Sequence, residues 1–284
     1  MMEENQATEN ENRSWKPDCE NCFGLCCVAL PFGNSAEFAE DKEGGKPCRN
    51  LLEDYRCGIH QKLRRKGFKG CTVFECFGAG QKVSQFTFKG VSWQENKAVA
   101  MDMFKVFPIM QQLHEMLCYL DEALQLQVTK EINQELEAVF QKTSSLTELK
   151  PEEILNLNIP EHRTLVNELL MKTSELLRQD ILSEKSKRLR GRNKKKGSDL
   201  IGANLRNLDL RGENFRGAWL IAADLRKTDL RFVDFIGADL RDADIRGADL
   251  RNSLFLTQVQ LNAANGDKYT KIPAGLNQPA HWFY

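Results

Sequence analysis

The sequence predicts an α+β protein of several domains, and three observations lead to this prediction. Eight of the nine cysteines in this 284-residue chain lie between residues 19 and 76. Residues 93–183 carry apolar side chains at helical spacing. From Leu200 onward, every fifth residue is large and apolar. We therefore expect a small cysteine-rich domain, a helical middle and a C-terminal coil of square cross-section.

Charge and hydropathy exclude several classes of partner. Lys+Arg and Asp+Glu both number 40, so the net charge is zero and gives no overall attraction to nucleic acid or an anionic membrane. No run of 18 apolar residues is present, so no membrane partner is expected. Residues 1–18 contain five acidic side chains and no apolar core, unlike a secretory signal or a transit peptide. We expect a disordered acidic tail and a cytoplasmic protein.

The cysteine cluster has three competing explanations: disulfides, a redox or nucleophilic thiol, and a metal site. A reducing cytosol disfavours disulfides. The spacing C-x-x-C brings two sulfurs to one side of a turn, and such soft ligands select zinc or iron–sulfur over magnesium or calcium. We predict zinc, with iron or an iron–sulfur cluster as the alternative. The predicted ligands are enough for two four-ligand sites, and they are Cys19, Cys22, Cys26, Cys27, Cys48, Cys57, Cys71 and Cys76.

Two details concern the grouping of these ligands. Adjacent Cys26 and Cys27 are expected to point in different directions and to serve different sites, because successive side chains of an extended chain alternate. His60, in the segment CGIH, could replace one sulfur. Cys118 lies in a helical segment far along the chain and is not expected to be a ligand.

The segments CENCFGLCC, PCRNLLEDYRCGIH and GCTVFEC together resemble the zinc- or iron-chelating cysteine-cluster family (YkgJ-like) over residues 19–76. The resemblance implies a metal-binding domain, which we place at residues 19–92. One interpretation of this domain is a closed metal site whose only role is to stabilise the small fold. A redox-sensing or electron-transfer cluster, oxidised disulfides and a catalytic cysteine remain open. FGAGQ, at residues 77–81, is interpreted as a turn, since it lacks the Lys-Ser/Thr of a phosphate loop.

A helical connector is predicted for residues 93–183, with Pro108 ending or kinking its first helix. Further helices are expected at 131–140, from Pro151, and at 161–182. His114 and His162 are expected in surface or packing roles. Residues 184–197 hold eight Lys/Arg and one Glu, and we interpret them as an exposed linker. Nucleic-acid binding by this basic linker is not expected, because no aromatic residue is interleaved for base stacking.

A five-residue repeat fills residues 198–255. Each centre is commonly preceded by Asp or Asn and followed by Arg, and Ala often stands two residues before it. Neither a helix nor a strand keeps a five-residue stripe on one face, whereas a square coil of twenty residues per turn does, which predicts about three turns. The centres are Leu200, Leu205, Leu210, Phe215, Leu220, Leu225, Leu230, Phe235, Leu240, Ile245, Leu250 and Phe255.

These A-(D/N)-L-x-x units resemble the pentapeptide-repeat family, and the resemblance implies a right-handed quadrilateral β-helix. Because a solenoid needs capped ends, residues 256–284 are expected to form a C-terminal cap that includes Trp282 and Phe283. Some members of that family protect DNA gyrase by imitating DNA. Ten acidic and nine basic residues between Asp199 and Arg251 make a poor imitation.

The sequence therefore favours a non-enzymatic, metal-binding interaction or scaffold protein with a protein partner, and a homodimer is a further expectation. A DNA-mimicking topoisomerase (gyrase) protection or antibiotic-resistance protein is the first alternative. A redox or iron–sulfur protein, or an enzyme centred on the cysteines, is the second.

Overall fold

A computed structural model describes residues 15–188 and 199–283 of the chain. The expected acidic tail and basic linker fall largely outside these residues, although residues 184–188 continue the last long helix. The elements in chain order are α2 (Leu25–Val28), η1 (His60–Lys62), η2 (Arg64–Lys66), α3 (Lys69–Thr72), α4 (Ala79–Gln81), η3 (Lys82–Thr87), α5 (Lys97–Leu124), η4 (Gln127–Ile132), α6 (Asn133–Leu146), α7 (Pro151–Leu155), α8 (Ile159–Arg188), α9 (Gln258–Ala263) and η5 (Ala280–Phe283).

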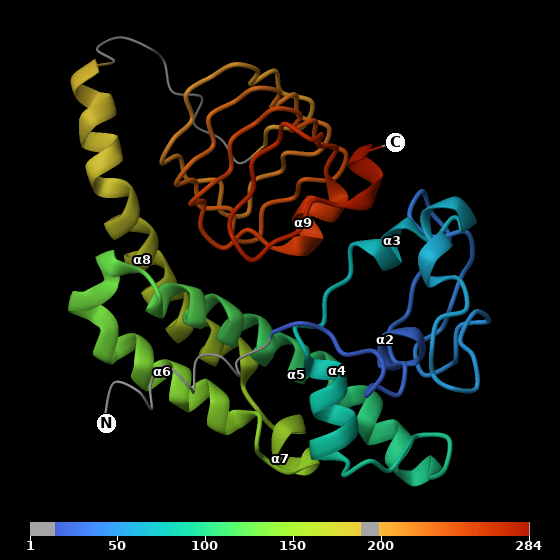
Figure 1. Cartoon of the computed structure of the whole chain (residues 1–284). Helices are drawn as coiled ribbons and strands as arrows, with labels where there is room; N and C mark the ends of the chain where they lie inside the picture. The colour runs from blue at the N-terminus through green and yellow to red at the C-terminus, as the bar shows by residue number, and fades with distance from the viewer. Residues whose placement is uncertain (1–14, 189–198, 284) are drawn as a thin grey trace. The chain divides into compact units, whose positions relative to one another are not determined.

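The chain forms two compact units. The first combines residues 15–71, 75–124 and 133–167, and the second combines residues 72–74, 125–132 and 168–283. Figure 1 shows the cysteine-rich segment in blue to cyan and the repeat in shades of orange. Among the described residues, no helix is apolar over a length that would cross a bilayer.

Helix α5 supplies the core of the first unit. Its buried side chains recur every three or four residues, as expected for one face of a helix, and include Met103, Phe107, Met110, Leu113, Met116, Leu117 and Leu120. Of the two expectations for Pro108, that it ends the helix is wrong, because α5 runs through it, and that it kinks the helix stays a prediction. Phe107 and Met110 beside the proline are both buried, so packing on this stripe offsets the lost backbone hydrogen bond.

The two histidines of this unit have packing roles. His114 is buried, and its Nδ1 lies 2.8 Å from the Phe77 carbonyl oxygen. His162 is also buried, with its Nε2 2.9 Å from the Thr143 hydroxyl. Burial lowers the pKa of His114 to about 4, so this imidazole is neutral at pH 7. Both histidines therefore have the packing role that was one of the two expected.

The repeat forms a coil with a period of twenty residues. Parallel bridges join Asp199 to Trp219 and Trp219 to Asp239, and further bridges of the same period follow along the chain. Backbone hydrogen bonds repeat with the coil, for example from Leu220 N to the Asp239 carbonyl at 2.9 Å. Each bridge in the described part is isolated, with no longer strand around it. The assignment to a right-handed quadrilateral β-helix stays a prediction.

The interior of the coil holds the predicted centres. Eleven of them are buried and Leu210 is partly buried. Two residues after most centres the backbone turns with positive φ, and these corners include Gly202, Asn207, Gly212, Gly217, Ala222, Lys227, Phe232, Gly237, Asp242, Gly247 and Asn252. The corners are therefore not reserved for glycine. The stacked hydrogen bonds of neighbouring turns hold residues such as Ala222 in a conformation that costs an L-residue about 1–2 kcal/mol.

The C-terminal segment closes this core. Gln260, in α9, donates from Nε2 to the carbonyls of Phe235 and Ala238 at 2.7 and 2.9 Å. Trp282 packs into the same core, and its Nε1 donates to the Ala264 carbonyl at 3.0 Å. Phe283, expected to share this role, is exposed instead, because the short helix η5 turns Trp282 inward and leaves its neighbour outside.

Candidate metal centre

The short helix α2 presents Cys26 and Cys27. It begins after Gly24, whose φ of 64° is in the left-handed region. A Cβ at Gly24 would lie 2.8 Å from the Tyr55 carbonyl oxygen, so only glycine permits this close approach. The sequence C-x-x-C-F-G-L-C-C therefore brings the loop around Tyr55 against the start of α2.

Backbone pairing brings two more cysteines toward α2. Cys48 N donates to the Cys27 carbonyl at 2.9 Å. Cys57 forms an antiparallel bridge with Leu51, and Leu51 N donates to the Cys48 carbonyl at 2.9 Å. Segments separated by more than twenty residues in the sequence thus meet at one helix.

A second close approach lies at Gly80 in α4. A Cβ there would be 2.7 Å from the Sγ of Cys22 and 3.9 Å from the Sγ of Cys76. Both sulfurs therefore lie over the backbone of Gly80. The glycine of FGAGQ makes room for thiols, a role that the sequence alone did not indicate.

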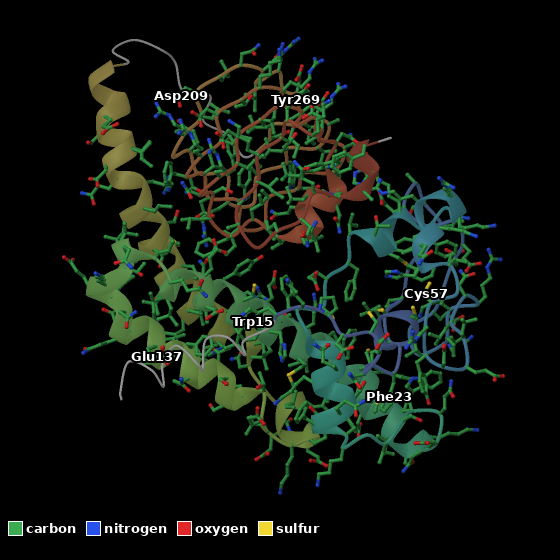
Figure 2. All side chains as sticks on the ribbon, in the orientation of Figure 1. Trp15, Phe23, Cys57, Glu137, Asp209 and Tyr269 are labelled. Atoms are coloured by element: carbon green, nitrogen blue, oxygen red, sulfur yellow. The ribbon has the colours of Figure 1, made fainter. Side chains whose placement is uncertain are left out.

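The sulfurs of Cys26 and Cys27 lie 4.0 Å apart and share a hydrogen bond. Our expectation that these neighbours point apart differs from this geometry, because α2 is helical where an extended chain was assumed. Two thiolates on one tetrahedral zinc, at about 2.3 Å each, are separated by about 3.8 Å. The observed separation is close to that value. Figure 2 shows yellow sulfur atoms gathered around α2, near the labelled Cys57.

Hydrogen bonds link three of the thiols near α2. A hydrogen bond with Cys27 is the main cause that lowers the pKa of Cys57, to about 6. A hydrogen bond with Cys27 also lowers the pKa of Cys26. Hydrogen bonds with Cys26 and then with Cys57 raise the pKa of Cys27 far above its usual range. Cys26, Cys27 and Cys57 therefore act as one interacting group.

The outer thiols are affected chiefly by desolvation. Burial raises the pKa of Cys22 and of Cys71 to about 12 and that of Cys76 to about 11. Burial also raises the pKa of Cys19. In all four cases the neighbouring charge of Cys26 adds to the increase. Such thiols stay protonated at pH 7 unless a cation replaces the proton.

The donor set fits a soft metal ion. Within residues 15–188 and 199–283, no three His, Cys, Asp or Glu side chains are already arranged as a metal site. Cys48 and Cys57 nevertheless pair with Cys27 of α2, and the sulfurs of Cys22 and Cys76 lie together over Gly80 of α4. All nine cysteines of the chain are unpaired thiols, and the Cys26–Cys27 separation is close to that of two ligands of one ion. His60, the predicted substitute ligand, is exposed beside Cys57, where its charge contributes to the lower pKa of that thiol.

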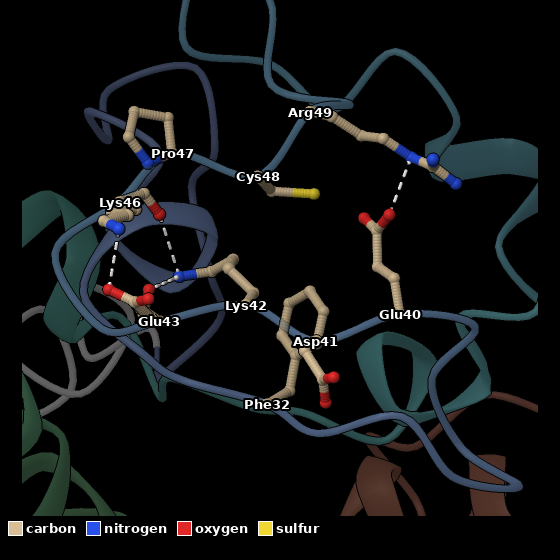
Figure 3. Close-up of a pocket in the computed structure, with 9 residues that line it drawn as sticks. All are labelled: Phe32, Glu40, Asp41, Lys42, Glu43, Lys46, Pro47, Cys48 and Arg49. Carbon is tan, nitrogen blue, oxygen red and sulfur yellow. Dashed lines mark hydrogen bonds and ion pairs between the residues drawn. The ribbon is translucent and has the colours of Figure 1, made fainter.

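A buried lysine, which the sequence did not reveal, lies beside the thiols. The Nζ of Lys42 donates to the carbonyls of Val28, Glu43 and Lys46 at 3.0–3.1 Å. Burial lowers its pKa, and the charges of Cys48, Cys27 and Cys26 oppose that decrease. Lys42 and Cys48 also line a pocket of about 390 Å³ together with Phe32, Glu40, Asp41, Glu43, Lys46, Pro47 and Arg49 (Figure 3). The ammonium group provides positive charge next to a group of potential thiolates.

Cys118 differs from the other eight cysteines. It lies on α5, where burial raises its pKa and the carboxylates of Glu122 and Asp121 add to the increase. The structure places it among acidic groups of the helix. We retain it as the internal control for any experiment on the cluster.

The outer surface of the coil carries paired charges. Arg231 donates to Asp229, one residue before the centre, with an Nη2–Oδ2 distance of 2.7 Å. The same pairing recurs at Asp209–Arg211, Asp224–Arg226, Asp239–Arg241, Asp244–Arg246 and Asp249–Arg251. On one face the pattern is interrupted, because Trp219 and Ile201 occupy outward positions and are 55% and 53% exposed. Tryptophan in place of the usual Asp was the sequence signal for this interruption.

The repeats and the cysteines together define a pentapeptide-repeat protein with an N-terminal thiol cluster. The family model described as "Pentapeptide repeats (8 copies)" matches residues 198–232 and 214–252. The chain is 57% identical over 274 residues to the uncharacterized protein YybG of Bacillus subtilis (strain 168), with 96% of this chain and 97% of the relative covered. The chain belongs to the family of YybG. The repeat match does not include the thiol cluster, whose resemblance to the cysteine-cluster family stays a prediction.

Proposed function

We propose that this pentapeptide-repeat protein is a non-enzymatic, cytoplasmic interaction protein whose cysteine-rich segment binds a soft metal ion, zinc in the first place. The observation that carries the proposal is the group of thiols at α2, where the sulfurs of Cys26 and Cys27 are 4.0 Å apart and Cys27 is also hydrogen-bonded to Cys57. The metal would be held by thiolates drawn from Cys19 through Cys76. Its role there would be structural, because a bound ion would hold together the loops of a segment that has little regular secondary structure.

Zinc binding is tested with a chromophoric chelator in competition with the reduced full-length protein. We expect zinc to be withdrawn from the chelator by the wild type and by Cys118→Ser, and much less by Cys57→Ser. Binding releases protons from the thiols, so affinity should rise with pH. Equal zinc uptake by Cys57→Ser and the wild type would contradict the assignment of Cys57 as a ligand. An absorption band in the visible range after anaerobic purification would favour the iron–sulfur alternative.

The interaction role rests on the surface of the coil. On the described part of the coil, six outward Asp–Arg pairs neutralise one another, which disfavours the acidic surface that a DNA mimic needs. Trp219 and Ile201 supply exposed apolar area on one face, and an aromatic residue of this kind is typical of the centre of a protein interface.

Full-length tagged protein and its Trp219→Asp variant are compared for proteins that copurify from cells. A protein partner that docks on this face should be retained by the wild type and lost by the variant, while Arg226→Ala retains it. Circular dichroism is used to check that the variant keeps its fold. Identical copurifying proteins with and without Trp219 would show that this face is not the interface.

A further inference from the structure

The segment of residues 16–23, which we call the first cysteine loop, carries the predicted ligands Cys19 and Cys22. It contains only turns and bends and has no helix or strand of its own. Several of its backbone groups are instead hydrogen-bonded by side chains that lie 61 to 70 residues further along the chain. The conformation of the loop therefore depends on these distant side chains.

Gln81, the last residue of α4, binds the first cysteine loop at two points. Its Oε1 accepts a hydrogen bond from Asp18 N at 3.1 Å. Its Nε2 donates to the Lys16 carbonyl at 3.0 Å. One amide side chain thereby satisfies a donor and an acceptor of the loop backbone.

Three more side chains bind the end of the same loop. Phe23 N donates to Ser84 Oγ at 3.1 Å, and Gln85 Nε2 donates to the Asn21 carbonyl at 2.9 Å. Trp93 Nε1 donates to the Phe23 carbonyl at 2.8 Å. All these bonds are made to the backbone of the loop, so they hold it without using its thiols.

Gln81, Ser84 and Gln85 come from one face of a helical segment, because residues three and four positions apart are neighbours on a helix surface. This segment consists of α4 and the π-helix η3, which follows it directly. A π-helical turn is rare and is frequent at functional sites. Ser84 is 0% exposed, so its hydrogen bond to the loop lies in the interior of the unit.

Two glycines allow the loop to lie directly on α4. A Cβ at Gly80 would be 2.7 Å from the Sγ of Cys22, and a Cβ at Gly78 would be 3.5 Å from the Lys16 carbonyl oxygen. The segment FGAGQKVSQ thus combines small residues, against which the loop packs, with three polar side chains that bind the loop backbone.

We propose that Gln81, Ser84 and Gln85 are positioning residues of the metal site, which hold the first cysteine loop so that Cys19 and Cys22 are in place before a soft divalent ion binds. This inference rests on the proposed metal-binding function and deepens it. A loop that is already ordered loses less conformational entropy when the ion binds, so these contacts raise metal affinity without supplying a ligand. Groups that orient metal ligands typically change the affinity by about 10–100-fold.

The experiment compares Gln81→Leu with Gln112→Leu in the reduced full-length protein without oxygen. Gln112 is also half-buried, but its Nε2 donates to the Pro108 carbonyl within α5 at 3.2 Å, so the control removes the same group away from the loop. In the metal-free protein, hydrogen exchange monitored by mass spectrometry should be faster in peptides of residues 16–23 for Gln81→Leu and unchanged for the control.

Zinc affinity is then measured by competition with a chromophoric chelator. Gln81→Leu should bind as many zinc ions at saturation as the wild type, with an affinity about tenfold lower, and Gln112→Leu should match the wild type. Gln85→Leu, at an exposed position, should show both effects to a smaller extent. It decides the question if Gln81→Leu does not fold.

Two results would overturn this positioning role. Unchanged exchange of the loop in Gln81→Leu and Gln85→Leu would show that these side chains do not order it. Faster exchange with an unchanged zinc affinity would show that the order of the loop does not assist metal binding. A wild-type protein that takes up no zinc refutes the proposed function and this inference with it, whereas uptake by the wild type with equal affinity in both variants refutes the inference alone.

Discussion

Replacing Arg216 by methionine should destabilise the coil far more than the same replacement at Arg241. Both residues follow a repeat centre and pair with an aspartate. Arg216 Nη1 is 3.0 Å from Asp234 Oδ2, and the Asp234 side chain is 0% exposed. Arg241 pairs with Asp239, but its side chain is 48% exposed. The two replacements therefore remove the same chemical group from a buried and from an exposed ion pair.

The expected losses of stability follow from the burial of each ion pair. Removing one partner of a buried pair leaves an uncompensated charge and costs about 3–5 kcal/mol, whereas an exposed pair contributes about 0–1 kcal/mol. Arg178 of α8 also lies near Asp234, and the charge of Asp234 partly offsets the decrease that burial causes in the pKa of Arg178. The remaining cation compensates part of the loss, so we expect Arg216→Met to cost about 3 kcal/mol.

Hydrogen exchange monitored by mass spectrometry gives the free energy of opening for peptides of the repeat in the full-length protein. Arg216→Met should raise exchange across the repeat, and Arg241→Met should leave it almost unchanged. Adding Asp234→Asn to Arg216→Met should recover part of the loss, because the buried charge is then removed. Equal effects of the two single replacements would refute the assignment of Asp234 as a buried, charge-dependent position.

Three further changes test other parts of the structure. Leu225→Asp places a carboxylate in the coil interior and should cost several kcal/mol, visible as loss of the cooperative thermal transition, while Arg226→Ala should have a small effect. His114 has its pKa lowered from 6.5 to about 4, so the unfolded chain binds the proton first and stability falls as pH decreases from 6.5 to 4. This contribution is about 3 kcal/mol, and urea unfolding should show a shallower decrease for His114→Gln; identical slopes would contradict it. Lys42→Met leaves three carbonyl acceptors without their shared donor, at about 1–3 kcal/mol each, and should lower the melting temperature well below that of the exposed control Lys46→Met.

The repeat could be predicted almost residue by residue, because each turn of the coil places the same chemical type in the same environment. The centres from Leu220 to Phe255 are all buried. The corners could not be predicted as fully, since Ala222 and Phe232 adopt positive φ under the constraint of neighbouring turns. Asp234 repeats the sequence pattern of Asp239, and only the tertiary structure buries it.

In the cysteine-rich segment, less of the arrangement could be predicted from the sequence. The sequence predicts the candidate ligands, and which of their sulfurs lie together depends on backbone conformation. The helical turn at Cys26 and Cys27 brings together two sulfurs that an extended chain would separate. Lys42 gave no sequence signal at all, because its role arises from three carbonyl groups that converge only in the folded chain.

The central claim, a thiolate metal centre at α2, is tested most directly by the intact mass of the protein purified without oxygen under non-denaturing conditions. The account predicts a mass increased by bound metal, which is lost on acidification to leave nine reduced thiols. The same protein carrying Cys26→Ser should show less added mass than the wild type, and Cys118→Ser should show as much. A metal-free protein whose mass is reduced by two hydrogens for each of four disulfides would contradict the claim.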